Sequence, residues 1–146
     1  MTATDANGAM TDHTGLRVMG TDECLERLGG AVIGRVAFVH DGEIVLLPVH
    51  HVLHGTDICF RTSGNSKIEA AADHDPMSYE VDDYDVSTRA GWSVTVTGIA
   101  SVVYDADVEA ALEADDRVPW TVGDPATSVW IRIRPDAITG RELLPA

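Results

Sequence analysis

Positive charge is scarce in this chain of 146 residues, which carries 10 lysines and arginines against 24 aspartates and glutamates and has a net charge of −14. Proteins that bind nucleic acid or an anionic membrane surface use patches of basic side chains to neutralise phosphate groups. The sequence contains no basic stripe of this kind. The composition therefore predicts that neither nucleic acid nor a membrane is a partner.

Long apolar segments are also missing, since the longest run, Ile44–Val49, is far too short to span a bilayer. The first 15 residues are polar and small, with no basic cluster followed by an apolar core. That pattern is typical of a disordered tail and not of a signal peptide. We therefore expect a cytoplasmic protein with a disordered tail over residues 1–15 and a single domain over residues 16–146.

Motifs for several kinds of chemistry are absent. Cys24 and Cys59 lie too far apart for a CxxC pair and are expected to be buried thiols. No serine nucleophile elbow and no Cys/His signature is present. The adjacent His50 and His51 would face opposite sides of a strand, and no other ligand stands at a zinc spacing from them. The sequence therefore predicts neither a hydrolase nor a metal site.

The residues that are present predict mostly strands. Alternation of apolar and polar residues is clearest from Trp92 to Val102, and Asp41–Gly42 is typical of a hairpin turn. The expected strands cover residues 34–40, 43–53, 58–62, 77–81, 92–102, 129–134 and 138–144, with a break at Arg134–Asp136. Short helices are expected over residues 21–28, 66–72 and 105–116, and loops over residues 82–85 and 118–120. This pattern favours a mainly β fold, an antiparallel barrel of six or seven strands with helices at its ends.

Lys67 is the only lysine in the chain, and it follows Ser66 at the expected start of a helix. The helix macrodipole disfavours a cation there, by a few tenths of a kcal/mol up to about 1 kcal/mol, so a bound anion such as phosphate is one explanation. With Arg61, this segment supplies a guanidinium, an ammonium, a hydroxyl and helix N-terminal amides. In a second explanation, which remains open, Ser66 caps the helix together with Glu69. The two cations then pair with Glu69 or Asp73 on a solvated face.

The order and spacing of several short segments resemble the pyridoxamine 5′-phosphate oxidase-like flavin-binding split-barrel proteins. The resemblance covers roughly residues 20–144. Its segments are Gly34–Val39, Leu47–Val49, Phe60–Thr62, Ser66–Lys67, Tyr79–Asp82, Gly91–Val94 and Ile138–Arg141.

This resemblance implies a homodimer of six-stranded split barrels that binds flavin mononucleotide (FMN) in clefts between the subunits. By position, Arg61 and Lys67 are similar to the family's phosphate-binding cations. Thr62 and Ser66 are similar to the hydroxyl donors to the same phosphate. The expected partners are therefore a second copy of the chain, FMN and a small-molecule substrate.

The flavin ring has its own expected contacts. The segment Pro48, Val49 and His50 resembles the one whose backbone lies along the isoalloxazine ring. Trp92 resembles an aromatic residue near the flavin, supplied by its own or the other subunit, and a core aromatic is the alternative. Many relatives have Asn and an aromatic residue after the Pro-Val pair, where this chain has His50 and His51. His50 is a candidate proton donor, with an ordinary packed histidine as the alternative.

The resemblance implies a flavin-dependent oxidoreductase that reduces a small organic molecule. A deazaflavin-dependent reductase and a non-catalytic flavin or haem binder are alternatives on the same scaffold, because a fold of this kind does not choose among them.

Overall fold

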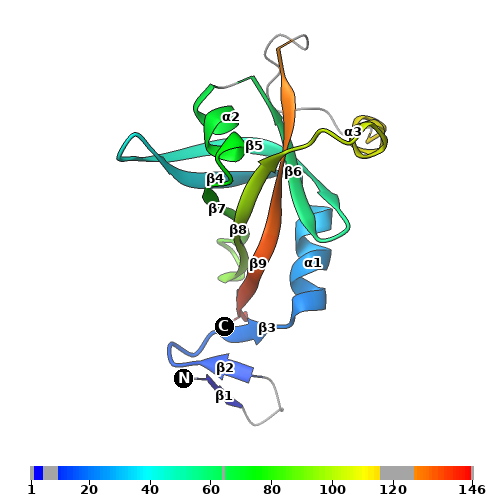
Figure 1. Cartoon of the computed structure of the whole chain (residues 1–146). Coiled ribbons are helices and arrows are strands. Elements are labelled where there is room, and N and C mark those ends of the chain that lie inside the picture. Colours follow the sequence, from blue (N-terminus) through cyan, green and yellow to red (C-terminus); the bar gives the residue numbers. More distant parts are fainter. Residues whose placement is uncertain (1, 5–9, 64, 116–126, 146) are drawn as a thin grey trace.

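Six antiparallel strands close into a barrel in the computed structural model, which describes residues 2–4, 10–63, 65–115 and 127–145 (Figure 1). These strands are β4 (Ile33–His40), β5 (Glu43–His54), β6 (Asp57–Thr62), β7 (Pro76–Asp85), β8 (Ala90–Val102) and β9 (Val129–Leu143). Neighbours follow the order β9–β6–β5–β4–β7–β8, and β8 pairs with β9 again. The predicted mainly β, antiparallel barrel is confirmed.

The hairpin between β4 and β5 forms as the sequence predicts. Asp41 and Gly42 both have left-handed backbone angles, with φ of 50° and 78°. Two consecutive residues of this kind make the tight turn whose twist matches that of the flanking strands. The first part of β5, up to His50, pairs with β4, and the part from His51 onward pairs with β6. Strand β5 therefore links these two strands in the barrel.

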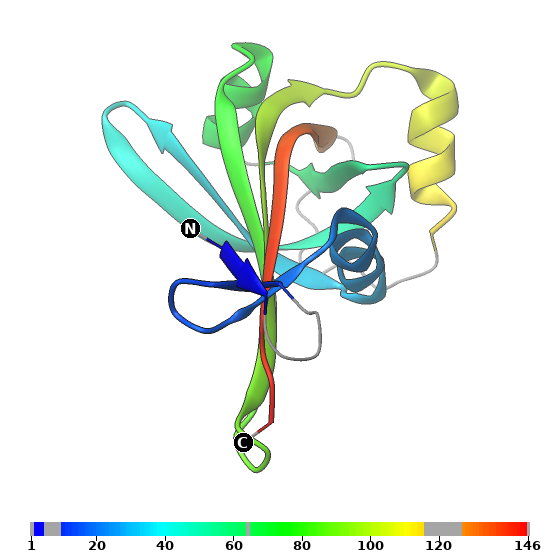
Figure 2. The same cartoon turned by 90° about the horizontal axis from the view of Figure 1, so that it is seen from below.

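Three helices accompany the barrel: α1 (Thr21–Gly30), α2 (Asn65–Ala72) and α3 (Ala106–Glu113). The first two contribute side chains such as Leu28 and Ala71 to the main core, where both are fully buried. Helix α3 packs on the outer face, where Leu112 contacts Val52 and Cys59 in a second, smaller cluster. From below, α1 and α3 lie to one side of the barrel and the β4–β5 hairpin projects to the other (Figure 2).

Alternate strand residues fill the barrel interior. Phe38, Phe60 and Val96 are examples, each at most 4% exposed. Their neighbours along the strands point outward, so each strand carries one apolar face toward the core. This alternation decides which of the candidate site residues reach the outer surface.

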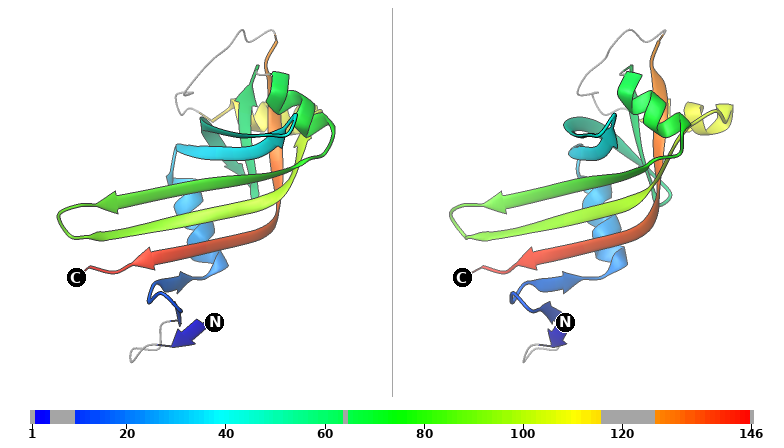
Figure 3. Two further views of the ribbon diagram at one scale, coloured as in Figure 1. Left: turned by 90° about the vertical axis from the view of Figure 1, so that its left-hand side faces the viewer. Right: turned by 60° about the vertical axis from the view of Figure 1, so that its left-hand side comes forward.

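Two strands are longer than the sequence predicts. The predicted loop at residues 82–85 is wrong, because these residues belong to β7, which pairs with β8 as far as Asp85 and Ala90. The predicted break at Arg134–Asp136 is also wrong, because β9 runs through it. A register shift between Thr97 and Gly98 accommodates Pro135, which lacks an N–H group to donate. As a result β7, β8 and β9 project together beyond the barrel (Figure 3).

The structure describes parts of the N-terminal segment, where the sequence predicts a disordered tail over residues 1–15, and this tail stays a prediction. The described parts form the short strands β1 (Thr2–Thr4), β2 (Met10–Asp12) and β3 (Arg17–Met19), and β3 pairs with the end of β9. The side chain of Asp12 accepts a hydrogen bond of 3.0 Å from Nε of Arg141, which helps to join this segment to β9. The domain boundary at residue 16 stays a prediction, and the predicted loop at residues 118–120 lies outside the described residues.

Candidate functional site

The outer faces of β5 and β6 bring two candidate residues together. His51 and Phe60 are directly paired across these strands and are both fully buried. Because successive strand residues point to opposite sides, His50 and Arg61, one step beyond this pair, face outward. Both side chains are half-buried there.

The guanidinium group of Arg61 has a close contact with Ser128 and a longer one with Glu113. Its Nε donates a hydrogen bond of 2.7 Å to Oγ of Ser128. Its Nη1 lies 3.8 Å from Oε1 of Glu113 on α3, which is too long for a hydrogen bond. The fork is therefore oriented by Ser128, and its contact with Glu113 is a weak, partly solvated ion pair.

Lys67 lies in the first turn of α2, which begins at Asn65, three residues after the end of β6 at Thr62. Among the described residues, no ion pair joins Lys67 to Glu69 or Asp73, and no capping hydrogen bond joins Ser66 to Glu69. The carboxylate of Glu69 instead lies 3.5 Å from Nε2 of His40. The described residues therefore lack the Ser66–Glu69 cap and the Lys67 ion pairs on which the second explanation depends.

Burial lowers the pKa of Lys67 below its ordinary value, because partial removal from water disfavours the charged ammonium group. Lys67 is half-buried, and no carboxylate in the described part of the chain offsets this effect. An anion beside Lys67 would restore the preference for the charged form.

The other predicted contacts divide between the two faces of the wall. On β5, Pro48 is exposed and faces outward with His50, whereas Val49 is buried and faces the core. On β6, Thr62 is 8% exposed and points to the opposite side from Arg61. Only the backbone of Val49 and Thr62 is therefore directed toward an outer ligand.

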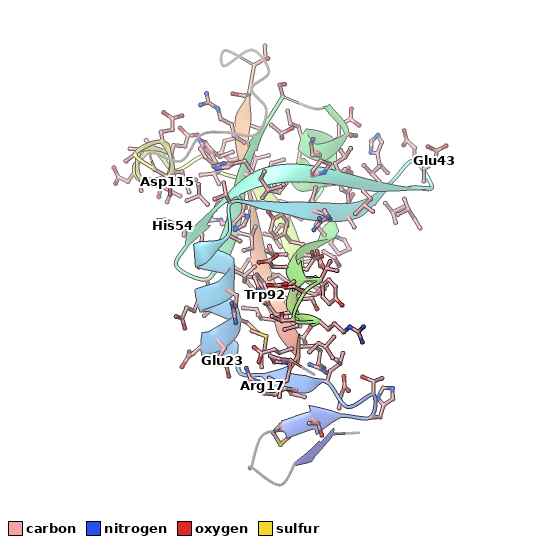
Figure 4. The ribbon with its side chains drawn as sticks, turned by 180° about the vertical axis from the view of Figure 1, so that it is seen from behind. Arg17, Glu23, Glu43, His54, Trp92 and Asp115 are labelled. Atoms are coloured by element: carbon pink, nitrogen blue, oxygen red, sulfur yellow. The ribbon has the colours of Figure 1, made fainter. Side chains whose placement is uncertain are left out.

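Trp92 lies elsewhere in the chain. Figure 4 shows it beside α1 and well separated from Asp115, which follows α3. The guanidinium carbon of Arg27 on α1 lies 5.0 Å from the centre of the Trp92 ring, and the indole also packs against the main core. It lines a cavity of about 700 Å³ between α1 and the β7–β8 hairpin, together with Ala31 and Val81. One chain alone does not bring Trp92 into contact with Arg61.

His51 has a role that the sequence did not reveal. Its Nε2 lies 2.8 Å from the carbonyl oxygen of Leu28, and its Nδ1 lies 2.5 Å from the hydroxyl of Tyr79. A carbonyl oxygen only accepts, so Nε2 donates to it. This fully buried imidazole joins the last turn of α1 to strands β5 and β7. His51 stands two positions after the apolar Val49 on the same strand, and this spacing was the available signal that His51 faces inward. Its hydrogen-bond partners, Leu28 and Tyr79, are distant in sequence and could not be predicted.

Two further observations concern the whole described part of the chain. No three His, Cys, Asp or Glu side chains are grouped there in a way that could hold a metal ion. In the same residues, no helix is long and apolar enough to cross a membrane.

Comparison with known proteins identifies the family. A sequence model of the pyridoxamine 5′-phosphate oxidase family matches residues 20–142, which is most of the chain. The chain belongs to this family. The match covers the whole barrel apart from the last residue of β9, and it includes all the candidate site residues.

Individual relatives of this oxidase-like family agree with the assignment. An uncharacterised Mycobacterium tuberculosis protein, Rv0080, is 31% identical over 124 residues, which are 82% of this chain and 80% of the relative. The FAD binding protein from Mycobacterium smegmatis is 30% identical, with a TM-score of 0.71 over 86% of this chain and 98% of that chain. The FAD and heme binding protein from the same organism is 18% identical, with a TM-score of 0.67 over 87% and 74% of the two chains, and shows the shared fold alone.

Proposed function

We propose that the chain is a flavin-dependent oxidoreductase that holds FMN on the outer face of β5 and β6, with the flavin phosphate between Arg61 and the first turn of α2. Lys67 is the observation that carries this proposal. The only lysine of an acidic chain is half-buried at a helix start, where both burial and the helix dipole disfavour its charge. A phosphate group with close to two negative charges would offset both effects.

The donors around this position fit a phosphate group. Arg61 offers a planar fork that Ser128 already orients, and Lys67 offers a point charge. Ser66 adds a hydroxyl, and the first turn of α2 adds backbone N–H groups that have no partner within the helix. Charge-assisted hydrogen bonds of this kind are roughly twice as strong as neutral ones.

The outward face of β5 is continuous with this cluster. Pro48 and His50 point to the same side as Arg61, so a ring bound along β5 would reach both the imidazole and the phosphate donors. When bound, the flavin supplies the hydride chemistry. The chain orients the ring, shields it from water and, through His50, offers a group that can donate a proton near neutral pH.

Flavin binding by the 30% identical Mycobacterium smegmatis protein supports this function. That relative is described as binding FAD, which contains the FMN moiety and an adenylate. Arg61 and Lys67, the phosphate cluster, could bind the phosphate group that FMN and FAD have in common. We propose FMN because its phosphate is terminal and carries the higher charge, which suits these two cationic donors.

Absorbance and reoxidation measurements test the function. We expect the purified protein, or the protein loaded with FMN, to show the spectrum of oxidised flavin. After anaerobic reduction, a quinone, a nitro compound or an enone should restore that spectrum in stopped flow. His50→Ala should keep the flavin but slow this step by about 10² or more, the usual scale for a positioned proton donor.

His13→Ala is the matched control, because His13 is exposed in the turn before β3 and should reoxidise like the unmodified protein. Reaction of His50→Ala at the unmodified rate would remove the catalytic role of His50. A haem spectrum, or reoxidation by oxygen alone, would contradict the oxidoreductase proposal.

We also propose that two copies of the chain form a dimer through the outer face of the β4–β5 hairpin. Three large apolar side chains stand on this face: Ile44 is 82% exposed, Leu46 64% and Val39 59%. Val39 and Ile44 are directly paired, so they form one continuous apolar surface. Contiguous exposed apolar surface of this kind marks an interaction site.

Ile44→Glu should therefore convert the dimer to a monomer, because a charge buried at an apolar interface costs several kcal/mol. Val86→Glu is the control, since Val86 is 79% exposed in the β7–β8 turn and away from the hairpin. Light scattering at micromolar concentration measures the mass of both variants. A monomeric unmodified protein that still binds flavin would sink the dimer proposal.

A further inference from the structure

A pocket of about 410 Å³ lies between the end of α2 and the strands β8 and β9. Two arginines, Arg132 and Arg134, line it together with His74, and no Asp or Glu lines it. Two of the ten basic residues of a chain with net charge −14 therefore meet in one concave site without a carboxylate in its lining. The two arginines lie on β9 at alternate positions, so they share its outer face.

The arginine side chains have few partners of their own. Nη1 of Arg132 is 3.6 Å from Oδ2 of Asp57, beyond hydrogen-bond distance. Its Nε is buried and has no hydrogen-bond partner among the described residues. In the same part of the chain, Arg134 makes no ion pair. A buried guanidinium N–H without an acceptor costs free energy, and an anion in the pocket would supply one.

The rest of the lining suits a small organic molecule. Ser101, directly opposite Arg132 in the β8–β9 pairing, adds a hydroxyl. Ile99 and Ala72 supply apolar walls, and Tyr104, which is 83% exposed, stands beside them. The volume lies within the range of ordinary small-molecule sites, about 300 to 1,000 Å³.

We propose that this pocket binds a small organic anion through a phosphate or carboxylate group held by Arg132 and Arg134. It is a different site from the phosphate cluster of Arg61 and Lys67. Lys67 lies in the first turn of α2, whereas the pocket adjoins the last residue of α2, Ala72, and α2 is eight residues, or about 12 Å, long. The proposal does not depend on the flavin function, because none of its lining residues belongs to that cluster.

Nuclear magnetic resonance of the ¹⁵N-labelled full chain tests this proposal. The Nε–Hε signals of Arg132 and Arg134, assigned from Arg132→Gln and Arg134→Gln, should shift on titration with inorganic phosphate or with succinate and should reach saturation. Arg134→Gln should weaken the apparent affinity seen at Arg132 by about tenfold or more, as expected for one charge-assisted contact. The anion that saturates at the lower concentration shows which group the pocket prefers.

Two control variants separate this site from others. Arg89→Gln removes an exposed charge in the β7–β8 turn and should leave the titration unchanged. Arg134→Lys, which keeps the charge, should bind more tightly than Arg134→Gln. The proposal is wrong if neither anion gives a saturable shift, or if Arg61→Gln abolishes the response while Arg134→Gln does not.

Discussion

Lys67→Met should weaken binding of FMN by about ten- to a hundredfold while weakening riboflavin binding much less, because one charge-assisted contact contributes about 1.5 to 3 kcal/mol. Arg61→Gln should have an effect of the same size. Riboflavin lacks the phosphate group, so the ratio of the two affinities isolates the contact to phosphate. Flavin fluorescence quenching measures both constants.

The stability of the ligand-free protein provides a control, because Lys67→Met should weaken FMN binding without lowering the free energy of unfolding at neutral pH. The pKa of Lys67 is lowered from its ordinary 10.5, so between the lowered pKa and 10.5 the unfolded chain binds more protons than the folded chain. The free energy of unfolding therefore rises as pH increases through that window. Lys67→Met removes this dependence and should not lower ligand-free stability at neutral pH. Equal losses of FMN and riboflavin, or a less stable ligand-free Lys67→Met, would mean that the residue supports the fold and not a phosphate.

Gly98→Ala should lower the free energy of unfolding by roughly 3 kcal/mol, at the upper end of the usual cost of overpacking. A Cβ atom at Gly98 would fall on the carbonyl oxygen of Arg134, in the bulge where β8 and β9 change register around Pro135. That atom is backbone and is held by the strand pairing, so it cannot move as a flexible side chain would. Urea denaturation followed by circular dichroism measures the change.

Gly30→Ala is the matched control for the same chemical change. A Cβ atom there meets nothing within 4 Å, and the position lies in α1, where Ala is the better helix former. We expect Gly30→Ala to be neutral or slightly stabilising. If Gly98→Ala unfolds at the same urea concentration as Gly30→Ala, the bulge is not the rigid element described above.

Local patterns predicted most of the barrel. Alternation from Trp92 to Val102 and the Asp41–Gly42 turn depend on neighbouring residues, and the structure has both the strand and the hairpin. The longer strands were missed for a physical reason. Pro135 normally ends a ladder because it has no N–H to donate. Strand β9 continues past it because Asp136 forms a bulge, which leaves Pro135 paired with Gly98 and Ala137 paired with Thr97 on β8, a strand far away in sequence.

For the candidate site, the sequence likewise predicted what neighbouring residues determine and missed what distant segments contribute. The sequence placed Arg61 and Lys67 at the ends of one short loop, which the structure has. It left two explanations for Ser66 open, because one of them depends on the partner of Glu69, whose carboxylate lies 3.5 Å from His40, a residue distant in sequence. The pocket of Arg132 and Arg134 was missed although their alternation was visible, because its other wall comes from the end of α2.

Strand β9 is the last barrel strand to leave the ribosome, and it fills the gap between β6 and β8. Until it emerges, both of these neighbours present an open edge of unpaired N–H and C=O groups, which readily pair with strands of other chains. Closure also joins segments far apart in sequence, which makes barrel formation slow relative to local hairpins. The nascent chain therefore passes through a period in which its β4–β5 and β7–β8 hairpins can exist but the barrel cannot. Protection of those two edges by a chaperone during synthesis would favour correct closure over association between chains.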